Sequence, residues 1–308
     1  MPGRTGMTEA HYIEGKYAYL DGLKAKFPHL TIGGCAGGGR ETDIEAYRRT
    51  QLNSRADGYC AGDQLCSQGE TYALSLWLPR HGQSQSTMDG LAVDPVTGTA
   101  LPRGASDTDY SFHSFMSMSM AFEYDWGGDT PGGWGKFRGW LKKFTGVRDL
   151  YDGDFYPLLP YSLSHFDCAR TPHSPSFLAL YAISRQTPGS AFNTCASVST
   201  PVLVACAGMG WQFHREDLGR GMIQLFRRAN SSLPSTTVPL YGLQPSTNYT
   251  LTAWERGAMG VMSGSELRAG LEVALPAAPA VCSEVNATLK GWTPSACGSS
   301  TVIEYRAA

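Results

Sequence analysis

Charged residues are scarce in this sequence, and neither sign is in excess. Asp, Glu, Lys and Arg make up 17% of the 308 residues, and the formal net charge is −2, whereas about a quarter of an average globular protein is charged. A nucleic-acid-binding surface and a charged tail are therefore excluded. The longest apolar run, Pro201–Gly210, has about half of the ~18 residues that a membrane-spanning helix needs. We expect a soluble protein.

Metal-binding spacings are also missing. The eight cysteines form no C-x-x-C pair, and no two histidines have the spacing of a zinc-binding helix, so we expect no metal site. Cys60 and Cys66, and likewise Cys282 and Cys297, are close enough in sequence for local disulfides. Buried free thiols fit the same residues equally well.

Evidence on the compartment is divided. Residues 1–6 lack the apolar stretch of a secretory signal, which argues against export. Three Asn-x-Ser/Thr sequons, at Asn230, Asn248 and Asn286, and the eight cysteines suit an oxidising compartment. A cytoplasmic and a secreted location therefore stay equally open.

The first half of the chain alternates helical and strand patterns. Apolar spacing predicts a helix over Tyr12–Phe27 and an amphipathic helix over Trp134–Leu150. Leu30–Ile32 is expected as a strand that enters a glycine-rich loop, and Thr42 with Glu45 forms the pattern of a capping box for a helix ending at Arg49. Met116, Met118 and Met120 alternate with serine, as on one face of a strand. This alternation is typical of a parallel α/β fold.

From about Tyr161 the pattern changes to short apolar runs between Gly, Pro and Asn, which predict an antiparallel sheet. We place a domain boundary near residue 160: residues 1–160 form an α/β part, and residues 161–308 form a β-sandwich with inserted loops near 191–207 and 277–300. Gly219 lies in an expected hairpin turn. The expected strands are Phe177–Ile183, Gly210–His214, Gly221–Phe226, Thr237–Leu240, Tyr249–Ala253, Leu271–Leu275 and Thr301–Tyr305.

The glycine-rich loop Gly33–Gly39 lies where a phosphate-binding loop would lie, between a strand and a helix. It fits neither G-x-G-x-x-G nor the P-loop pattern, which needs a lysine where Arg40 stands. Its glycines let a ligand approach the backbone closely. Such a strand end suits a neutral ligand rich in hydroxyl groups.

The same residues carry a resemblance to a known family. Phe27–Glu45, with its core Cys35-Ala36-Gly37-Gly38-Gly39-Arg40, resembles the corresponding segment of the α-galactosidase (melibiase) family related to glycoside hydrolase family 36. Further similar pieces follow in the same order along nearly the whole chain. They are Arg55–Asp57, Gln68–Tyr72, Leu74–Pro79, Tyr151–Leu158, Trp211–Arg215 and Gly219–Arg227.

The resemblance implies a retaining glycosidase with a TIM-type barrel, a C-terminal β-sandwich and specificity for terminal α-galactosyl units. Retention uses two carboxylates roughly 5–5.5 Å apart, one as nucleophile and one as acid/base. Asp57 matches the acid/base position. Asp63 is the fallback, because residues 58–63 align loosely and Ala56 departs from the serine usual in relatives. Cys35, Gly37 and Gly38 match the sugar-contacting loop, and Arg55 and Trp77 are expected pocket neighbours.

The family nucleophile lies upstream of the helix that is Tyr12–Phe27 here, and the residues before that helix contain no aspartate. About 160 residues suffice for about four of the eight barrel units. We therefore expect the C-terminal portion of a barrel followed by a sandwich, and no glycosidase activity from this chain alone. With Arg55 nearby and no second carboxylate, Asp57 is expected to be ionised.

The alternatives to this fragment are a non-catalytic carbohydrate-binding protein, a degenerate paralogue and a truncated gene model. The chemistry calls for no cofactor, and the expected partner is a galactoside or oligosaccharide rather than nucleic acid or a membrane. A barrel cut open leaves unpaired strand edges, which favour self-association. His81 and His214 are expected to be structural residues.

Overall fold

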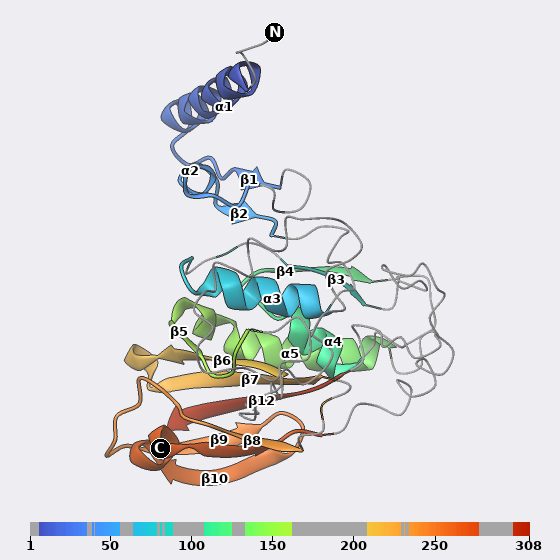
Figure 1. Cartoon of the computed structure of the whole chain (residues 1–308), viewed down its shortest axis with the longest axis vertical. Coiled ribbons are helices and arrows are strands. Elements are labelled where there is room, and N and C mark those ends of the chain that lie inside the picture. Colours follow the sequence, from blue (N-terminus) through green and yellow to red (C-terminus); the bar gives the residue numbers. More distant parts are fainter. Residues whose placement is uncertain are drawn as a thin grey trace, which may run out of the picture.

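The computed structural model describes residues 6–35, 39, 41–55, 64–78, 81, 84–88, 108–124, 133–161, 208–228, 231, 234–276 and 298–308. The N-terminal elements lie at one end of the molecule and the C-terminal sheet lies at the other (Figure 1). No helix among these residues is long and apolar enough to cross a membrane.

The largest element is an antiparallel sheet in the order β10-β9-β12-β7-β6-β5. A smaller antiparallel pair, β8 (Ser235–Val238) with β11 (Leu271–Ala274), and helix α7 (Gly264–Ala269) accompany it. The sheet strands are β5 (Asp154–Pro157), β6 (Gly208–Arg215), β7 (Arg220–Arg228), β9 (Asn248–Ala253), β10 (Gly257–Ser263) and β12 (Gly298–Ala307).

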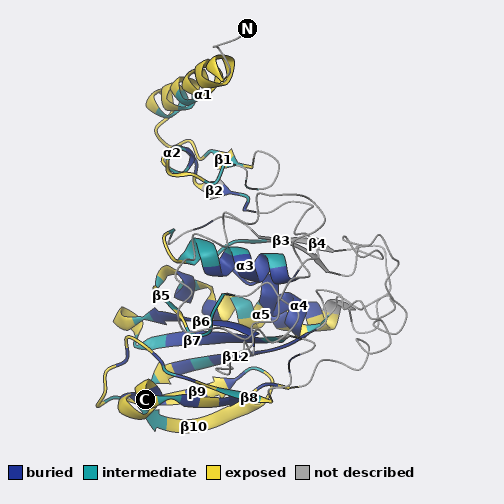
Figure 2. Cartoon of the chain, viewed as in Figure 1, coloured by how far each residue is buried: buried dark blue, intermediate teal, exposed yellow. Residues whose placement is uncertain are grey.

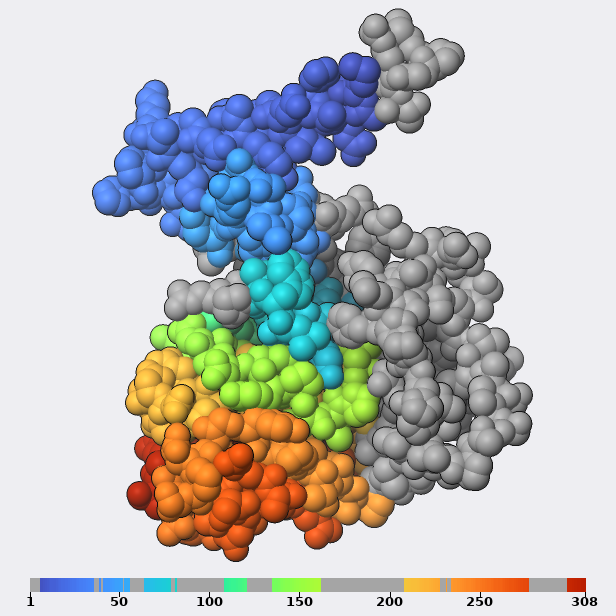
Figure 3. All heavy atoms as spheres, turned by 60° about the vertical axis from the view of Figure 1, so that its left-hand side comes forward, coloured from blue at the N-terminus to red at the C-terminus, as the bar shows by residue number. Residues whose placement is uncertain are grey.

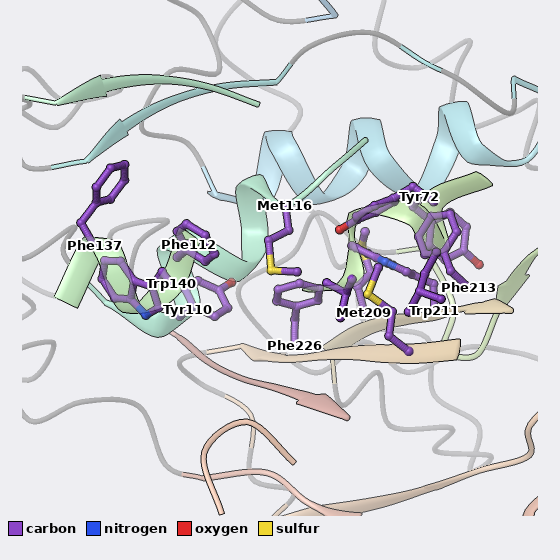
Figure 4. Packing of buried hydrophobic residues seen from close by; sticks show 14 residues of the cluster. Tyr72, Tyr110, Phe112, Met116, Phe137, Trp140, Met209, Trp211, Phe213 and Phe226 are labelled. Carbon is purple, nitrogen blue, oxygen red and sulfur yellow. The ribbon is translucent and has the colours of Figure 1, made fainter. Parts of the chain in front are cut away.

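Both faces of the sheet are covered, because its strands alternate between two apolar clusters. On β6, Trp211 and Phe213 face an aromatic cluster under the helices, whereas on β7 Ile223 and Leu225 face an aliphatic cluster with Val238 and other residues of β8 and β11. Figure 4 shows the first cluster between the helices and the sheet. The result is an antiparallel sheet with helices on one face and a small second sheet on the other, consistent with a sandwich domain.

Three helices cover the aromatic cluster: α3 (Gln64–Ser75), α4 (Asp109–Phe115) and α5 (Gly133–Val147), which continues into the 3₁₀ helix η1 (Arg148–Asp152). Between α3 and α4 the contact is polar. Buried Gln64 and Gln68 donate to the hydroxyl oxygens of Ser111 and Ser114, at 3.1 and 2.7 Å. Buried amides that are satisfied in this way fix how the two helices meet.

The N-terminal elements are α1 (Met7–Lys26), β1 (Gly33–Gly34), α2 (Ile44–Tyr47) and β2 (Leu52–Asn53), with β1 parallel to β2. A second parallel pair joins β3 (Ser84–Met88) and β4 (Met120–Tyr124). Within the described residues the parallel strands form these two separate pairs. Figure 2 shows that α1 is largely exposed, whereas the central strands β6, β7 and β12 of the antiparallel sheet are largely buried.

Most of the predicted elements are confirmed. Helices α1 and α5 and strands β6, β7, β9, β11 and β12 match or largely overlap the expected runs, and Gly219 turns between β6 and β7 with φ of +57°. β8 lies two residues before its expected run Thr237–Leu240 and shares only Thr237 and Val238 with it. Strands β5 and β10 and helix α7 were not expected. β12 begins at Gly298, within the expected 277–300 loop, and β5 joins the sheet although it precedes residue 160. The expected strand Phe177–Ile183 and the 191–207 loop lie outside the described residues.

Three local predictions are wrong. The strand expected over Leu30–Ile32 is instead Gly33–Gly34, so the first two glycines of the expected loop form β1. Asp43, not Thr42, caps α2, because its carboxylate accepts from the backbone N–H of Ala46 while the Thr42 hydroxyl donates to the Gly39 carbonyl oxygen. The Met116–Met120 alternation does not mark a strand face, because α4 ends at Phe115 and β4 begins only at Met120. Met116 is nevertheless fully buried. The alternating methionines and serines of residues 116–120 therefore lie at the end of a helix and in a bend, and not on the two faces of a strand.

Candidate functional site

The carboxyl ends of β1 and β2 lie at one edge, because the two strands are parallel. Cys35 follows β1 and is exposed, and Arg55 follows β2. The backbone N–H of Ser54 donates to the Gly34 carbonyl oxygen at 2.7 Å. This edge is where the sequence places the glycine-rich loop and, two residues after Arg55, the acid/base candidate.

Two glycines of the loop are needed for its contact with β2. Gly39 has φ of +85°, and a Cβ there would overlap the carbonyl oxygen of Arg55. A Cβ at Gly34 would overlap the side-chain oxygen of Asn53. Part of the glycine content therefore serves packing of the loop against the next strand, and not only the approach of a ligand.

Arg55 is turned into the protein. Its side chain is fully buried, its Nε lies 3.5 Å from Oε2 of Glu70 on α3, and Nη2 donates to the Ser67 carbonyl oxygen at 3.4 Å. Burial lowers the pKa of the guanidinium, and the Glu70 carboxylate opposes that shift. Arginine starts from so high a pKa that it stays charged. Arg55 and Glu70 thus tie the end of β2 to α3.

His81 completes this cluster. Its Nδ1 lies 3.3 Å from Nη1 of Arg55, which has only protons to give, so Nδ1 is the acceptor. Nε2 then carries the proton and donates to the Ser75 hydroxyl at 2.9 Å. These contacts describe a neutral, structural histidine. We call Arg55, Glu70, His81 and Ser75 the Arg55 cluster.

The sequence singled out Arg55 and His81 but missed Glu70 and the polar face of α3. Gln64, Ser67, Gln68 and Thr71 recur at spacings of three and four and are all fully buried. That periodicity, which is helical although the residues are polar, was the available signal.

The remaining site candidates divide into two groups. Trp77 follows α3 and is 49% exposed, so part of its indole is open to a ligand. Asp57, Asp63, Gly37 and Gly38 lie outside the described residues. Cys66 is disulfide-bonded. No group of three or more His, Cys, Asp or Glu side chains among the described residues is arranged to hold a metal ion.

A second cluster of titratable groups lies between α4 and the sheet. His113 Nδ1 is 2.8 Å from the Ser300 hydroxyl and 3.8 Å from Oε1 of Glu255, whose other oxygen accepts from Thr301 at 2.6 Å. Burial lowers the pKa of His113 to about 4 and raises that of Glu255. A Ser-His-acid triad needs serine and acid on opposite ring nitrogens. Here both approach Nδ1, so the cluster is structural.

A shallow cavity of about 470 Å³ opens at the β5–β6 edge, lined by Asp152, Asp154, His214, Glu216 and others. Its arginine, Arg215, is paired with Asp217 through two hydrogen bonds of 2.7 and 2.6 Å. His214 bonds the Tyr305 hydroxyl at 3.0 Å and is buried. These partners fit the expected structural role of His214.

A scan of protein-family models and a search of curated proteins found no match. Solved structures do match. The structural neighbours of this chain are α-galactosidases of glycoside hydrolase family 36. AgaB from Geobacillus stearothermophilus matches with a TM-score of 0.63 and 19% identity, and a variant of AgaA from the same organism, in complex with raffinose, matches with 0.62 and 19%. The α-galactosidase from Lactobacillus brevis matches with 0.62 and 16%.

Each of these matches covers 100% of this chain and 33% of the neighbour. The chain therefore spans about a third of the length of the family 36 structures that it resembles. At such low identity the likeness shows the fold. The resemblance predicted from the glycine-rich segment is confirmed at that level.

Proposed function

We propose that this chain is the C-terminal part of an α-galactosidase-like retaining glycosidase that acts on terminal α-galactosyl units of oligosaccharides. The observation that carries the proposal is the β1–β2 edge, where the Cys35 loop and the segment leading to Asp57 meet, in a chain with the family 36 fold. Residues 1–160 form the catalytic-domain portion, a partial barrel, and residues 161–308 form the sandwich.

Asp57 is assigned the acid/base role, with Asp63 as the fallback. Asp57 follows Arg55 by two residues, and Asp63 immediately precedes α3, so both belong to the segment between the end of β2 and α3. That segment begins at the strand end that the Arg55–Glu70 pair anchors. Cys35, Gly37 and Gly38 supply the sugar-contacting loop, and Trp77 offers an open ring face for stacking on a sugar. Arg55 is a pocket neighbour that holds the strand end.

The chain alone is expected to be inactive. A retaining glycosidase needs a carboxylate to attack the anomeric carbon while the acid/base protonates the leaving oxygen. The family resemblance places this nucleophile upstream of the helix that contains Tyr12, and the residues before Tyr12 contain no aspartate. Without a second negative charge across the sugar, Asp57 also lacks the like-charge repulsion that keeps an acid catalyst protonated near neutral pH.

An assay of the purified chain on a nitrophenyl α-galactoside tests this proposal. We expect no turnover. Turnover that persists through purification and disappears in Asp57→Asn would contradict the proposed inactivity and would assign the acid/base role directly. Turnover that disappears only in Asp63→Asn would move that role to the fallback residue.

The second candidate is a non-catalytic carbohydrate-binding protein, which the exposed Trp77 ring and the bound raffinose of the AgaA neighbour favour. Calorimetry with galactose and raffinose separates this candidate from a chain with no sugar site. Trp77→Ala should abolish binding, and Tyr241→Ala, which removes a comparably exposed ring from the sandwich, should leave it unchanged. The chemistry of either candidate requires no cofactor, and the open edges of the partial barrel favour self-association.

A further inference from the structure

One of the three Asn-x-Ser/Thr sequons lies on strand β9. Asn248-Tyr249-Thr250 forms the first half of the strand, directly after a turn in which the Thr247 backbone N–H donates to the Gln244 carbonyl oxygen at 3.1 Å. The sequons at Asn230 and Asn286 begin outside the described residues. A folded chain can carry an N-linked glycan only where the asparagine is open to solvent, because the glycan is bulky and polar. The geometry of β9 therefore decides whether this sequon can be used.

The two residues that define the sequon are exposed, and the residue between them is buried. Because side chains alternate along a strand, Asn248 and Thr250 lie on one face of the sheet and Tyr249 lies on the other. Tyr249 is held there by an edge contact with the Tyr305 ring and by the Gln244 backbone N–H, which donates to its hydroxyl at 3.1 Å. Within the described part of the chain, the side chains of Asn248 and Thr250 make no hydrogen bond. Both groups are therefore accessible.

The surface beside Asn248 contains an exposed apolar side chain that a glycan would cover. Ser263 of β10 lies opposite Asn248, and Val261 lies opposite Thr250, so Val261 is a diagonal neighbour of Asn248 on the same face, at about 7–8 Å. Val261 is 58% exposed, and β10 is the outermost strand of the described sheet. Figure 3 shows the segment that contains β9 and β10, in orange, at the surface of the C-terminal end. A glycan here would shield an edge strand, where unpaired backbone groups favour aggregation.

Cys66 gives independent evidence on the compartment. It is disulfide-bonded, and disulfides form and persist in oxidising compartments such as the lumen of the endoplasmic reticulum, whereas cytosolic thiols are kept reduced. N-linked glycans are attached to proteins that enter the same secretory route. The first residues of the chain do not decide the question, because the chain spans about a third of the length of its structural neighbours.

We propose that Asn248 carries an N-linked glycan, attached in the oxidising compartment in which Cys66 forms its disulfide. The donor is an oligosaccharide joined to a lipid through a diphosphate. The side-chain nitrogen Nδ2 forms a bond to C1 of the first sugar while the bond between C1 and the diphosphate oxygen breaks. The lipid diphosphate is the leaving group and takes up the proton that the amide loses. The proposal goes beyond the glycosidase function and does not depend on it.

Mass spectrometry of the protein from the cells that make it tests the proposal. A peptide-N-glycosidase converts a glycosylated asparagine to aspartate, so we expect this change at Asn248 after treatment and an attached glycan before it. A digest without reductant should show Cys66 in a disulfide. An unmodified Asn248 overturns the proposal, and a free thiol at Cys66 in the same protein overturns the compartment on which it rests.

A second experiment isolates this sequon. The 308-residue chain is produced behind a cleavable secretion signal in a eukaryotic host, with Asn230→Gln and Asn286→Gln removing the other two sequons. We expect one glycan, seen as a single gel shift that an endoglycosidase removes. Thr250→Ala should abolish the shift, and Thr250→Ser, which keeps the hydroxyl, should retain it. The matched control is Thr252→Ala, which is exposed on the same face of β9 outside the sequon and should leave the shift unchanged.

A chain without the shift, or a shift that survives in Thr250→Ala, overturns the proposal. Near-UV circular dichroism of each variant verifies that the sheet is folded. These readouts are independent of galactosidase turnover, so a failure of the proposed function would leave them intact.

Discussion

The segment from Met7 to Arg55 and the C-terminal sheet are stabilised by different interactions. Of the thirteen exposed large apolar side chains in the described part of the chain, seven lie between Met7 and Ile44. Among the residues of this segment whose burial the structure describes, Ala46 is the one buried apolar residue, and Thr50, Asn53 and Arg55 are buried as well. The sheet, by contrast, has an apolar cluster on each face.

The two regions differ in how much apolar surface their own elements bury. A parallel sheet is normally covered on both faces, and a two-stranded one is marginal alone. β1 and β2 form such a pair. The neighbouring helices α1 and α2 are linked by charged contacts of Arg49 with Asp21 and Glu45. The antiparallel sheet has its own core. The described part of the N-terminal segment therefore lacks an apolar core like the one on each face of the sheet.

The largest expected effect comes from the core of the sheet. Trp211 is fully buried, its indole N–H donates to Gln224 Oε1 at 2.9 Å, and its ring lies 5.0 Å from that of Phe226. Trp211→Ala should cost about 3–5 kcal/mol of unfolding free energy, measured by denaturant titration with circular dichroism. Trp77→Ala, at a half-exposed tryptophan, should cost less than about 1 kcal/mol. Equal losses would contradict the difference between the two regions.

A substitution at Glu70 tests the Arg55–Glu70 ion pair between the end of β2 and α3. Glu70→Leu leaves the Arg55 guanidinium buried without its carboxylate, which should cost about 3 kcal/mol. Adding Arg55→Met should recover most of that loss, because an apolar pair replaces a charged one. Hydrogen exchange should show faster opening of β2 and α3 with the sheet unchanged. Loss of protection throughout the molecule would show that the two regions unfold as one.

His113, which is buried between α4 and the sheet, allows a prediction of how the free energy of unfolding depends on pH. Its pKa falls from 6.5 to about 4 on folding because it is buried. Between these two values the unfolded chain binds a proton that the folded chain does not, so the stability present at neutral pH is lost as the pH falls from 6.5 towards 4. The raised pKa of Glu255 acts in the opposite direction. The shift of His113 alone corresponds to an acid loss on the order of 3 kcal/mol, which Glu255 reduces.

His113→Asn should flatten this acid limb in denaturant titrations at several pH values. His11→Asn is the matched control, because His11 lies on the exposed helix α1 and makes only a surface contact with Glu14. An acid limb that is unchanged in His113→Asn would assign the pH response to other groups.

The smallest effect is expected at Arg49, whose partners are exposed. Arg49→Gln removes its contacts with Asp21, Glu45 and the Tyr17 ring. Because exposed ion pairs are weak and are screened by salt, the helix signal should fall slightly at low salt and not at high salt. Far-UV circular dichroism in both conditions measures this. A large loss that salt does not change would mean that packing, rather than charge, holds α1 in place.

The sequence by itself determined the elements whose local pattern agrees with their surroundings. Helix α5 and strands β6, β7 and β9 were predictable because apolar residues recur with the period of the element that buries them. Cys35 follows a strand as predicted, although that strand is Gly33–Gly34 and not the apolar run Leu30–Ile32. The resemblance to the α-galactosidase family likewise rests on the amino-acid sequence around Cys35.

Only the tertiary structure decided which partner each polar group takes. Arg55 could face a sugar or the protein interior, and the choice depends on Glu70 and His81, which lie on or beyond α3. Either Thr42 or Asp43 could cap α2, and the structure shows that the Asp43 side chain accepts the hydrogen bond from the Ala46 backbone N–H. β5 and β10 are strands because they pair with β6 and β9. Hydrogen bonds and ion pairs between distant segments leave no period in the sequence. The apolar pattern could therefore be read in advance and the polar contacts could not.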